Sequence, residues 1–278
     1  MTDQNEANYF AIEALSASGC KHLLRSPAHY KNWRDNPVEP TAAMKLGTAV
    51  HGQILEPELT HFIIQPPHID RRTKAGREEF DALTEEAKRR GLPIISYDDA
   101  IKAEAIRDAV YANPRAMELL IDAQTEVPVY WDSLEAKVKC KAKIDALRPD
   151  IETVIDIKTT RDASQGAFSR GIFNMFYHLQ AAHYCEAYAH LNDGAFPKEF
   201  VFIAVETEAP YATALYRLTP SCIDLGMRMR NIAAERYKRA IETNVWSGYD
   251  EAEIISIEAP AWANRETNAT TNEEWSIG

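Results

Sequence analysis

The stretch AKVKCKAKIDALRPDIETVIDIKTT, residues 136–160, decides the fold class of this chain. Its first half alternates between polar and apolar residues, and this period of two predicts a β-strand over residues 136–147 with one apolar face. Pro149-Asp150 then turns the chain into a further strand, ETVIDIK. Isoleucines flank Asp156 in that strand, so we expect it to lie inside a sheet with its other face buried.

These two strands bring carboxylates together. Asp156 and Lys158 are two residues apart and therefore share a face. Asp145, on the preceding strand, and Glu126, at the start of the hairpin, could reach the same place. Three converging carboxylates repel one another unless a divalent cation neutralises them, and oxygen ligands suit Mg²⁺ or Mn²⁺ better than Zn²⁺. The alternative is an internal Asp–Lys ion pair with a structural role.

A row of lysines accompanies Asp145 on the first strand. Lys139, Lys141 and Lys143 alternate with apolar residues, so their side chains are expected on one face at intervals of about 6.5–7 Å. Cations at this spacing can follow a phosphate backbone, and we predict that these three lysines bind DNA. The alternative is the solvated outer face of an antiparallel strand.

Helical patterns precede this region, and strands alternate with helices after it. The sequence predicts a helix over residues 41–55, a polar helix that ends at Gly91, a helix that begins near Ser96, and another at Pro114. Later come a strand in EVPVYW (126–131), a helix over 177–191, two strands and a long helix from Pro220. This order predicts an α/β fold, a mixed β-sheet flanked by helices with a helical N-terminal elaboration. We expect a single domain over residues 1–262, with a helical part at 1–122 and the core at 123–245, followed by a polar tail at 263–278.

Composition narrows the class of protein. The 278 residues are 45% hydrophobic and 26% charged, which is ordinary for a globular chain. A formal net charge of −11 argues against a protein that coats nucleic acid nonspecifically, but it permits a local basic track. The four cysteines form no C-x-x-C pair, which argues against zinc ribbons and iron–sulfur clusters. Neither a signal peptide nor an apolar run of 18 residues is present, so we expect a cytoplasmic protein without membrane contact.

Several motifs together resemble one family. Asp145 and Asp156-Ile-Lys158, with ten residues between the two aspartates, are similar to the signature of the PD-(D/E)XK nuclease core. Further blocks resemble those of the RecE-type exonucleases (exonuclease VIII): LGTAVH (46–51), LEPE (55–58), DRRTKAGREE (70–79), TEVPVYW (125–131), DIKTT (156–160) and YHLQAAHY (177–184). The resemblance runs from about Leu15 to Trp262.

The resemblance implies roles for individual residues. The metal ligands would be His51, Glu126, Asp145, Asp156 and the backbone carbonyl of Ile157. Lys158 would be the catalytic lysine, and Gln180 and Tyr184 would line the site and touch DNA. Arg71, Arg72 and Lys74 could bind the displaced strand or a 5′ phosphate, or could belong to a solvated turn.

The resemblance also implies a function. The protein would be a Mg²⁺- or Mn²⁺-dependent exonuclease that digests one strand of double-stranded DNA from its ends, 5′→3′, and leaves 3′ single-stranded overhangs. Such enzymes form ring-shaped homo-oligomers and cooperate with a RecT-like single-strand annealing protein in phage or prophage recombination. Two alternatives remain open, a PD-(D/E)XK endonuclease and a catalytically inactive DNA-binding protein with the same fold.

Overall fold

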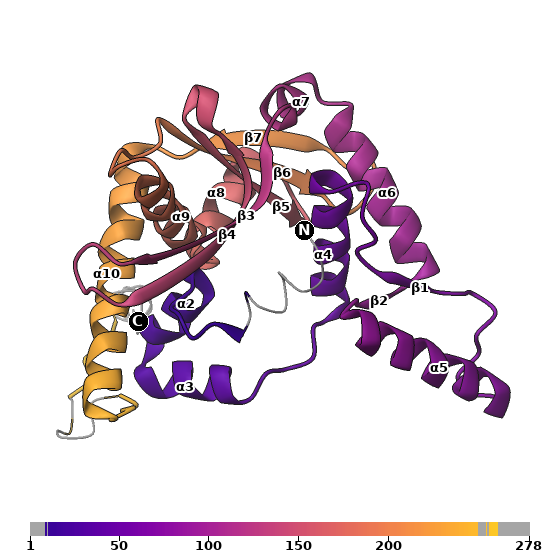
Figure 1. Ribbon diagram of the computed structural model, residues 1–278, viewed down its shortest axis with the longest axis horizontal. Helices are drawn as coiled ribbons and strands as arrows, with labels where there is room; N and C mark the ends of the chain where they lie inside the picture. Colours follow the sequence, from indigo (N-terminus) through magenta and orange to yellow (C-terminus); the bar gives the residue numbers. More distant parts are fainter. Residues whose placement is uncertain (1–8, 10, 250–253, 255, 261–278) are drawn as a thin grey trace, which may run out of the picture.

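A five-stranded mixed sheet forms the centre of the computed structural model, which describes residues 9, 11–249, 254 and 256–260 (Figure 1). Its strands follow in the order β3 (Gln124–Asp132), β4 (Lys139–Arg148), β5 (Thr153–Thr160), β6 (Glu199–Glu206) and β7 (Thr213–Arg217). β5 and β6 are parallel, whereas the other neighbours are antiparallel. β5 is thus an internal strand, and the predicted mixed α/β fold is confirmed.

On both faces of this sheet and beside it, the described residues form helices. They are α2 (Ala17–Arg25), α3 (Pro27–Asp35), α4 (Ala42–Leu55), α5 (Lys74–Arg90), α6 (Tyr97–Tyr111), α7 (Pro114–Leu120), α8 (Gln165–Asn174), α9 (Tyr177–Leu191) and α10 (Pro220–Thr243). A 3₁₀ turn, η1 (Pro149–Ile151), joins β4 to β5, and β1 (Ile63–Gln65) pairs with β2 (Ile94–Ser96) in a small parallel sheet.

Two apolar clusters divide the helices between the faces. On one face, buried residues of α2, α8, α9 and α10 pack on Val154 and Phe202 of the sheet. On the other face, α4 and α6 pack on Ile155 and Ile157. Figure 1 shows α9 and α10 on one side of the strands and α4 and α6 on the other. Alternation along β5 therefore sends its isoleucines toward α4 and α6, and sends Asp156 toward α9.

The strands β4 and β5 separate where the charged residues lie. They are paired only from Ala146–Ile155 to Arg148–Thr153. Beyond Asp145, β4 bonds instead to Leu15, whose N–H donates to the Lys139 carbonyl and whose carbonyl accepts from the Lys141 N–H, each at 2.9 Å. The separation leaves space between β4 and β5 for the side chains of Asp145 and Asp156.

Most predicted helix boundaries are confirmed by their capping geometry. The side chains of Ser16, Thr41 and Ser96 accept backbone N–H groups at the starts of α2, α4 and α6. Gly91 ends α5 with φ +67°, the left-handed conformation that glycine adopts at lowest cost. Pro27 opens α3 directly after the N-cap Ser26.

In the part of the chain that the structure describes, no helix combines the length and apolarity needed to cross a membrane. The predicted polar tail at 263–278 lies outside the described residues. The limits of the single domain stay a prediction.

Candidate active site

Asp156 is the most enclosed member of the site. It is fully buried, its Oδ1 accepts a hydrogen bond of 2.9 Å from Gln180 Nε2 on α9, and its Oδ2 forms an ion pair with Lys158. Burial raises the pKa of Asp156 to about 6, and the charge of Asp145 adds to the increase, whereas Lys158 opposes it. Gln180 also donates to the Tyr184 hydroxyl at 3.2 Å. The structure thus brings Asp156, Lys158, Gln180 and Tyr184 together as the sequence predicts.

Asp145 approaches from β4 across the gap between the strands. Its Oδ2 accepts a hydrogen bond of 2.9 Å from the Ile157 backbone N–H and lies 3.3 Å from His51 Nε2. Burial on its own would raise the pKa of Asp145, but the hydrogen bond and the charge of His51 lower it below its usual value. Asp145 is therefore an ionised carboxylate beside the more readily protonated Asp156.

His51 reaches the same place from α4. Its Nε2 lies 2.6 Å from the Ile157 carbonyl oxygen, and its Nδ1 lies 2.8 Å from the Gly47 carbonyl oxygen. Burial alone would lower the pKa of His51, but the hydrogen bond and charge of Asp145 raise it to about 9. An imidazolium fits this geometry, because both ring nitrogens face oxygen acceptors.

Glu126 completes the group of carboxylates from β3. Thr125 pairs with Ala146 and Val127 pairs with Ile144, so Glu126 and Asp145 are opposite each other in the register. Glu126 has φ +52°, a strained conformation for a residue other than glycine, of the kind that concentrates at functional sites. Its carboxylate is buried and forms an ion pair with Lys143, and burial raises its pKa.

The donor set suits a hard divalent cation. Three carboxylates, one carbonyl and one imidazole face this region, and the buried oxygens Glu126 Oε2 and Asp156 Oδ2 each have a lysine ammonium beside them. Within that part of the chain, no group of three or more His, Cys, Asp and Glu side chains is already arranged around an ion position. Each carboxylate has a protein cation beside it, namely Lys143, His51 or Lys158.

The lysine row differs from its prediction. Lys139, Lys141 and Lys143 do alternate with buried apolar residues, but they do not form a continuous exposed row. Lys141 is 9% exposed and donates to the carbonyls of Tyr9 and Ile12, at 2.8 and 2.7 Å. The N-terminal segment thus covers the middle lysine of the row. Lys141 is therefore neither on an exposed basic row nor on a solvated strand face, the two arrangements that the alternation predicted.

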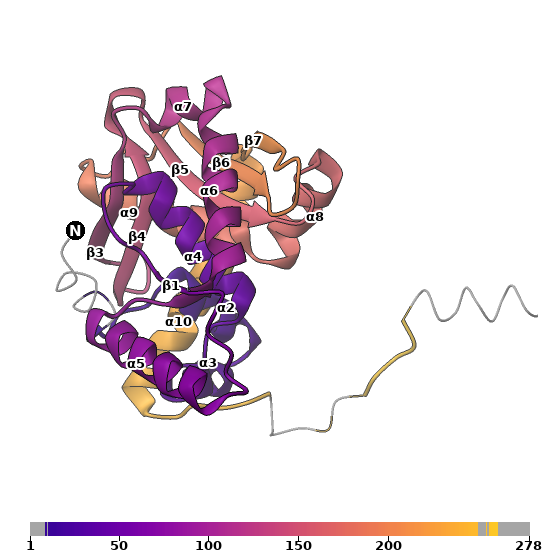
Figure 2. The ribbon, with the colours of Figure 1, turned by 90° about the vertical axis from the view of Figure 1, so that its right-hand side faces the viewer.

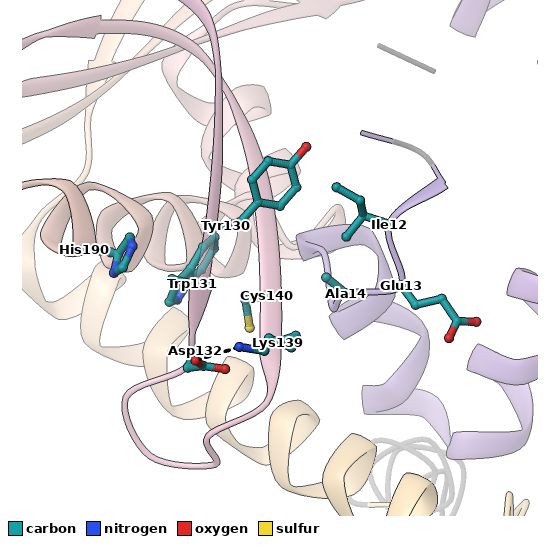
Figure 3. A pocket seen from close by; sticks show the side chains of 9 residues that line it. All are labelled: Ile12, Glu13, Ala14, Tyr130, Trp131, Asp132, Lys139, Cys140 and His190. Atoms are coloured by element: carbon teal, nitrogen blue, oxygen red, sulfur yellow. Dashed lines mark hydrogen bonds and ion pairs between the residues drawn. The ribbon is translucent and has the colours of Figure 1, made fainter. Parts of the chain in front are cut away.

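Lys139 lies at the hairpin end of β4, beside a cavity of about 240 Å³ that Figure 3 shows. Its ammonium donates to Asp132 at 2.9 Å, and Trp131, Cys140 and His190 also line the cavity. None of the carboxylates of the site lines it. This cavity is therefore distinct from the candidate active site.

The basic residues at 71–74 are not brought to the carboxylates. They lie at the start of α5, which stands apart from the sheet in both views (Figures 1 and 2). Arg72 pairs with Asp70 at 2.9 Å, Lys74 lies 3.9 Å from Glu78, and Arg71 stacks 4.1 Å from the centre of the Phe80 ring. Their binding to DNA stays a prediction.

Two neighbours of Lys158 were not assigned from the sequence. Tyr177, at the start of α9, carries the Lys158 ammonium 5.0 Å from its ring centre, and Lys21 of α2 lies 5.6 Å from the same ring. Nothing in the sequence around Lys21 singles it out, because a lysine on a short amphipathic helix is ordinary. Only the packing of α2 against α9 reveals its position.

The mixed sheet, with Asp145 and Asp-Ile-Lys on neighbouring strands, defines a protein of the PD-(D/E)XK class. More specifically, the chain belongs to the family described as "PDDEXK-like domain of unknown function (DUF3799)", whose model matches residues 16–257. Nucleases of the PD-(D/E)XK class generally use divalent metal ions. No curated protein matches the sequence.

One solved structure shows the same fold, and a second is similar to a lesser extent. A "Putative exonuclease" from Eubacterium rectale is similar with a TM-score of 0.62 at 15% identity, over 93% of this chain and 94% of the other. A phage-related exonuclease from Haemophilus somnus 129PT matches with a TM-score of 0.34 at 11% identity, over 84% of this chain and 96% of the other. Family and fold together support a nuclease.

Proposed function

We propose that this protein is a metal-dependent double-strand DNA exonuclease that digests one strand 5′→3′ and leaves 3′ single-stranded overhangs. The observation that supports the proposal is the closeness of the charged side chains: Asp156 pairs with Lys158, and the charge of Asp145 acts on both Asp156 and Glu126. Asp156 and Lys158 are costly to bury, and the charge of Asp145 beside them adds a second carboxylate that a structural ion pair does not need.

In this proposal Glu126, Asp145, Asp156, His51 and the Ile157 carbonyl would hold Mg²⁺ or Mn²⁺, which supplies charge neutralisation at the phosphate and an acidified water. The remaining chemistry belongs to the protein's own side chains. Gln180 fixes the rotamer of Asp156 through its hydrogen bond. The Lys158 ammonium, held by Asp156 and the Tyr177 ring, is positioned to stabilise negative charge that develops on the phosphate.

End-labelled DNA tests the proposed activity and its polarity. Linear duplexes carrying either a 5′ or a 3′ label are incubated with the protein and Mg²⁺, next to a covalently closed circle of the same sequence. We expect mononucleotide release from the 5′ label first, a lasting 3′-labelled strand, and an intact circle. Cleavage of the circle would identify an endonuclease instead, and loss of the 3′ label first would reverse the polarity.

A further inference from the structure

Lys21 presents an ammonium group close to the catalytic lysine. It lies 5.6 Å from the centre of the Tyr177 ring, and Lys158 lies 5.0 Å from that same centre. Both distances are within the range of cation–π contacts, so the ring of Tyr177 contacts the ammonium groups of two lysines from different elements. α2 holds Lys21 in place, because Cys20 and Leu23 on either side of it are completely buried.

The ammonium of Lys21 has no anionic partner among the described residues. Lys158 is paired with Asp156 and Lys143 with Glu126, and Lys141 donates to two carbonyls, whereas Lys21 has only the aromatic ring. Burial and the charge of Lys158 lower the pKa of Lys21 to about 8. A half-buried cation beside a second cation is unfavourable on its own and would be relieved by an anion that neutralises both.

We propose that Lys21 is a substrate-binding residue that contacts a phosphate oxygen of the DNA strand, on the phosphate next to the phosphodiester that is hydrolysed beside Lys158. The inference rests on the proposed nuclease function and assigns to that site a second lysine from α2. The ligand chemistry is a phosphate monoanion or dianion, which a backbone phosphodiester or a terminal 5′ phosphate could supply. Lys158 would then act on the reacting phosphate, while Lys21 holds its neighbour.

The test compares Lys21→Met, Lys21→Arg and the matched control Lys31→Met with the wild-type protein. Met retains the aliphatic stem, and Arg retains the charge. Lys31 is a suitable control because its ammonium already donates to Asp35 at 2.7 Å and is 45% exposed. Duplex binding is measured with Ca²⁺ as a function of salt, and single-turnover cleavage with Mg²⁺, on duplexes with and without a 5′ phosphate.

Lys21→Met is expected to bind duplex about tenfold more weakly, with a log–log salt slope smaller by about 0.9, the value for one lost phosphate contact. Lys21→Arg is expected to restore the slope, and Lys31→Met to keep it. An equal loss on both duplexes identifies a backbone phosphate, and a loss confined to the phosphorylated duplex identifies a terminal one.

If the wild-type protein cleaves DNA and Lys21→Met matches Lys31→Met in slope and rate, the inference about Lys21 is wrong and the nuclease function stands. If the wild-type protein neither binds nor cleaves duplex DNA, the proposed function fails, and the inference fails with it. Thermal melting of each variant shows whether a loss of binding comes from unfolding.

Discussion

His51 shows how the site balances the charge of Asp145. Its two ring nitrogens contact the carbonyl oxygens of Gly47 and Ile157, and Asp145 lies 3.3 Å from Nε2. An imidazolium can donate at both ends, whereas a neutral ring would place one lone pair against an oxygen. The proton on His51 therefore offsets part of the negative charge of Asp145.

The raised pKa of His51 predicts a pH-dependent stability. The pKa is about 6.5 in an unfolded chain and rises to about 9 in the folded protein. This stabilisation is fully present below pH 6.5 and is lost as the pH rises through 9, and its size is on the order of 3 kcal/mol. We expect urea unfolding in EDTA to show this loss for the wild-type protein, and a flatter profile for His51→Gln. Parallel profiles for the two proteins would contradict the charged state of His51.

A substitution of Lys158 distinguishes a catalytic role of this lysine from a purely structural ion pair with Asp156. In Lys158→Met the apolar stem remains, but the buried Asp156 loses its counter-charge, so its pKa should rise above its present value of about 6. We expect turnover to fall by at least about 100-fold, which is typical of losing a group that stabilises charge in the transition state. The measurement is single-turnover cleavage together with thermal melting.

The structural alternative makes the opposite prediction for the same variant. If Lys158 only pairs with Asp156, the melting temperature of Lys158→Met falls while the rate per folded molecule stays at the wild-type value. Lys31→Met, which removes an exposed and already paired ammonium, serves as the control for the change in charge.

At the scale of elements, local patterns predicted most of the architecture. The strand β4 and the helices α4, α5, α6, α9 and α10 follow from periodicity and capping residues, because these signals depend on neighbours in the sequence. β2 was missed because a three-residue strand carries no measurable period. The carboxylates on β4 and β5 were found because alternation fixes their faces, and the family motifs singled out His51.

What depends on packing could not be predicted. The separation of β4 from β5 arises from pairing with Leu15, about 125 residues away in the sequence. Two other features also depend on contacts between residues far apart in the sequence. The carbonyls of Tyr9 and Ile12 cover Lys141, and Lys21 lies beside Tyr177. The buried ion pair of Glu186 with Arg230, which joins α9 to α10, is likewise invisible to periodicity.

The contact between α9 and α10 predicts the effect of a single methyl group. A Cβ at Gly226 would lie 2.1 Å from the backbone oxygen of His178, so the two helices must separate to accept it. We expect Gly226→Ala to destabilise the protein by about 2 kcal/mol or more and to displace Gln180 on the same helix. Chemical denaturation measures the loss.

Gly171→Ala is the matched control for this substitution. Gly171 lies within α8, and a Cβ there would meet nothing within 4 Å. Alanine favours helix over glycine, so this variant should be neutral or up to about 1 kcal/mol more stable. Equal effects of the two substitutions would contradict the close packing of α9 on α10.

At the scale of the molecule, a net charge of −11 must coexist with binding to a polyanion. Of the cations proposed to face the substrate, Lys21 and Lys158 lie at the candidate site, whereas Arg71, Arg72 and Lys74 lie apart from it at the start of α5. We propose that several copies surround the DNA, as the resemblance to RecE-type exonucleases implies, and that a single-strand annealing protein takes up the overhang.

This assembly predicts the mass of the protein in solution. Light scattering coupled to size-exclusion chromatography should give an integer multiple of the chain mass, three or more, at micromolar concentration. Digestion by such a ring should continue along one duplex when excess unlabelled competitor is added after binding. A monomeric mass throughout this range would contradict the ring, although it would leave the chemistry of the site intact.

The most direct test of the metal-dependent hydrolytic site is cleavage of bound linear duplex on addition of Mg²⁺, with the wild-type protein and Asp156→Asn compared. Asn retains the acceptor for Gln180 but removes the buried charge. Both proteins are first bound to the duplex in Ca²⁺. The account predicts rapid cleavage by the wild-type protein on Mg²⁺ addition and none by Asp156→Asn, which stays folded and bound. Cleavage by Asp156→Asn at the wild-type rate, or cleavage by the wild-type protein in EDTA, would contradict it.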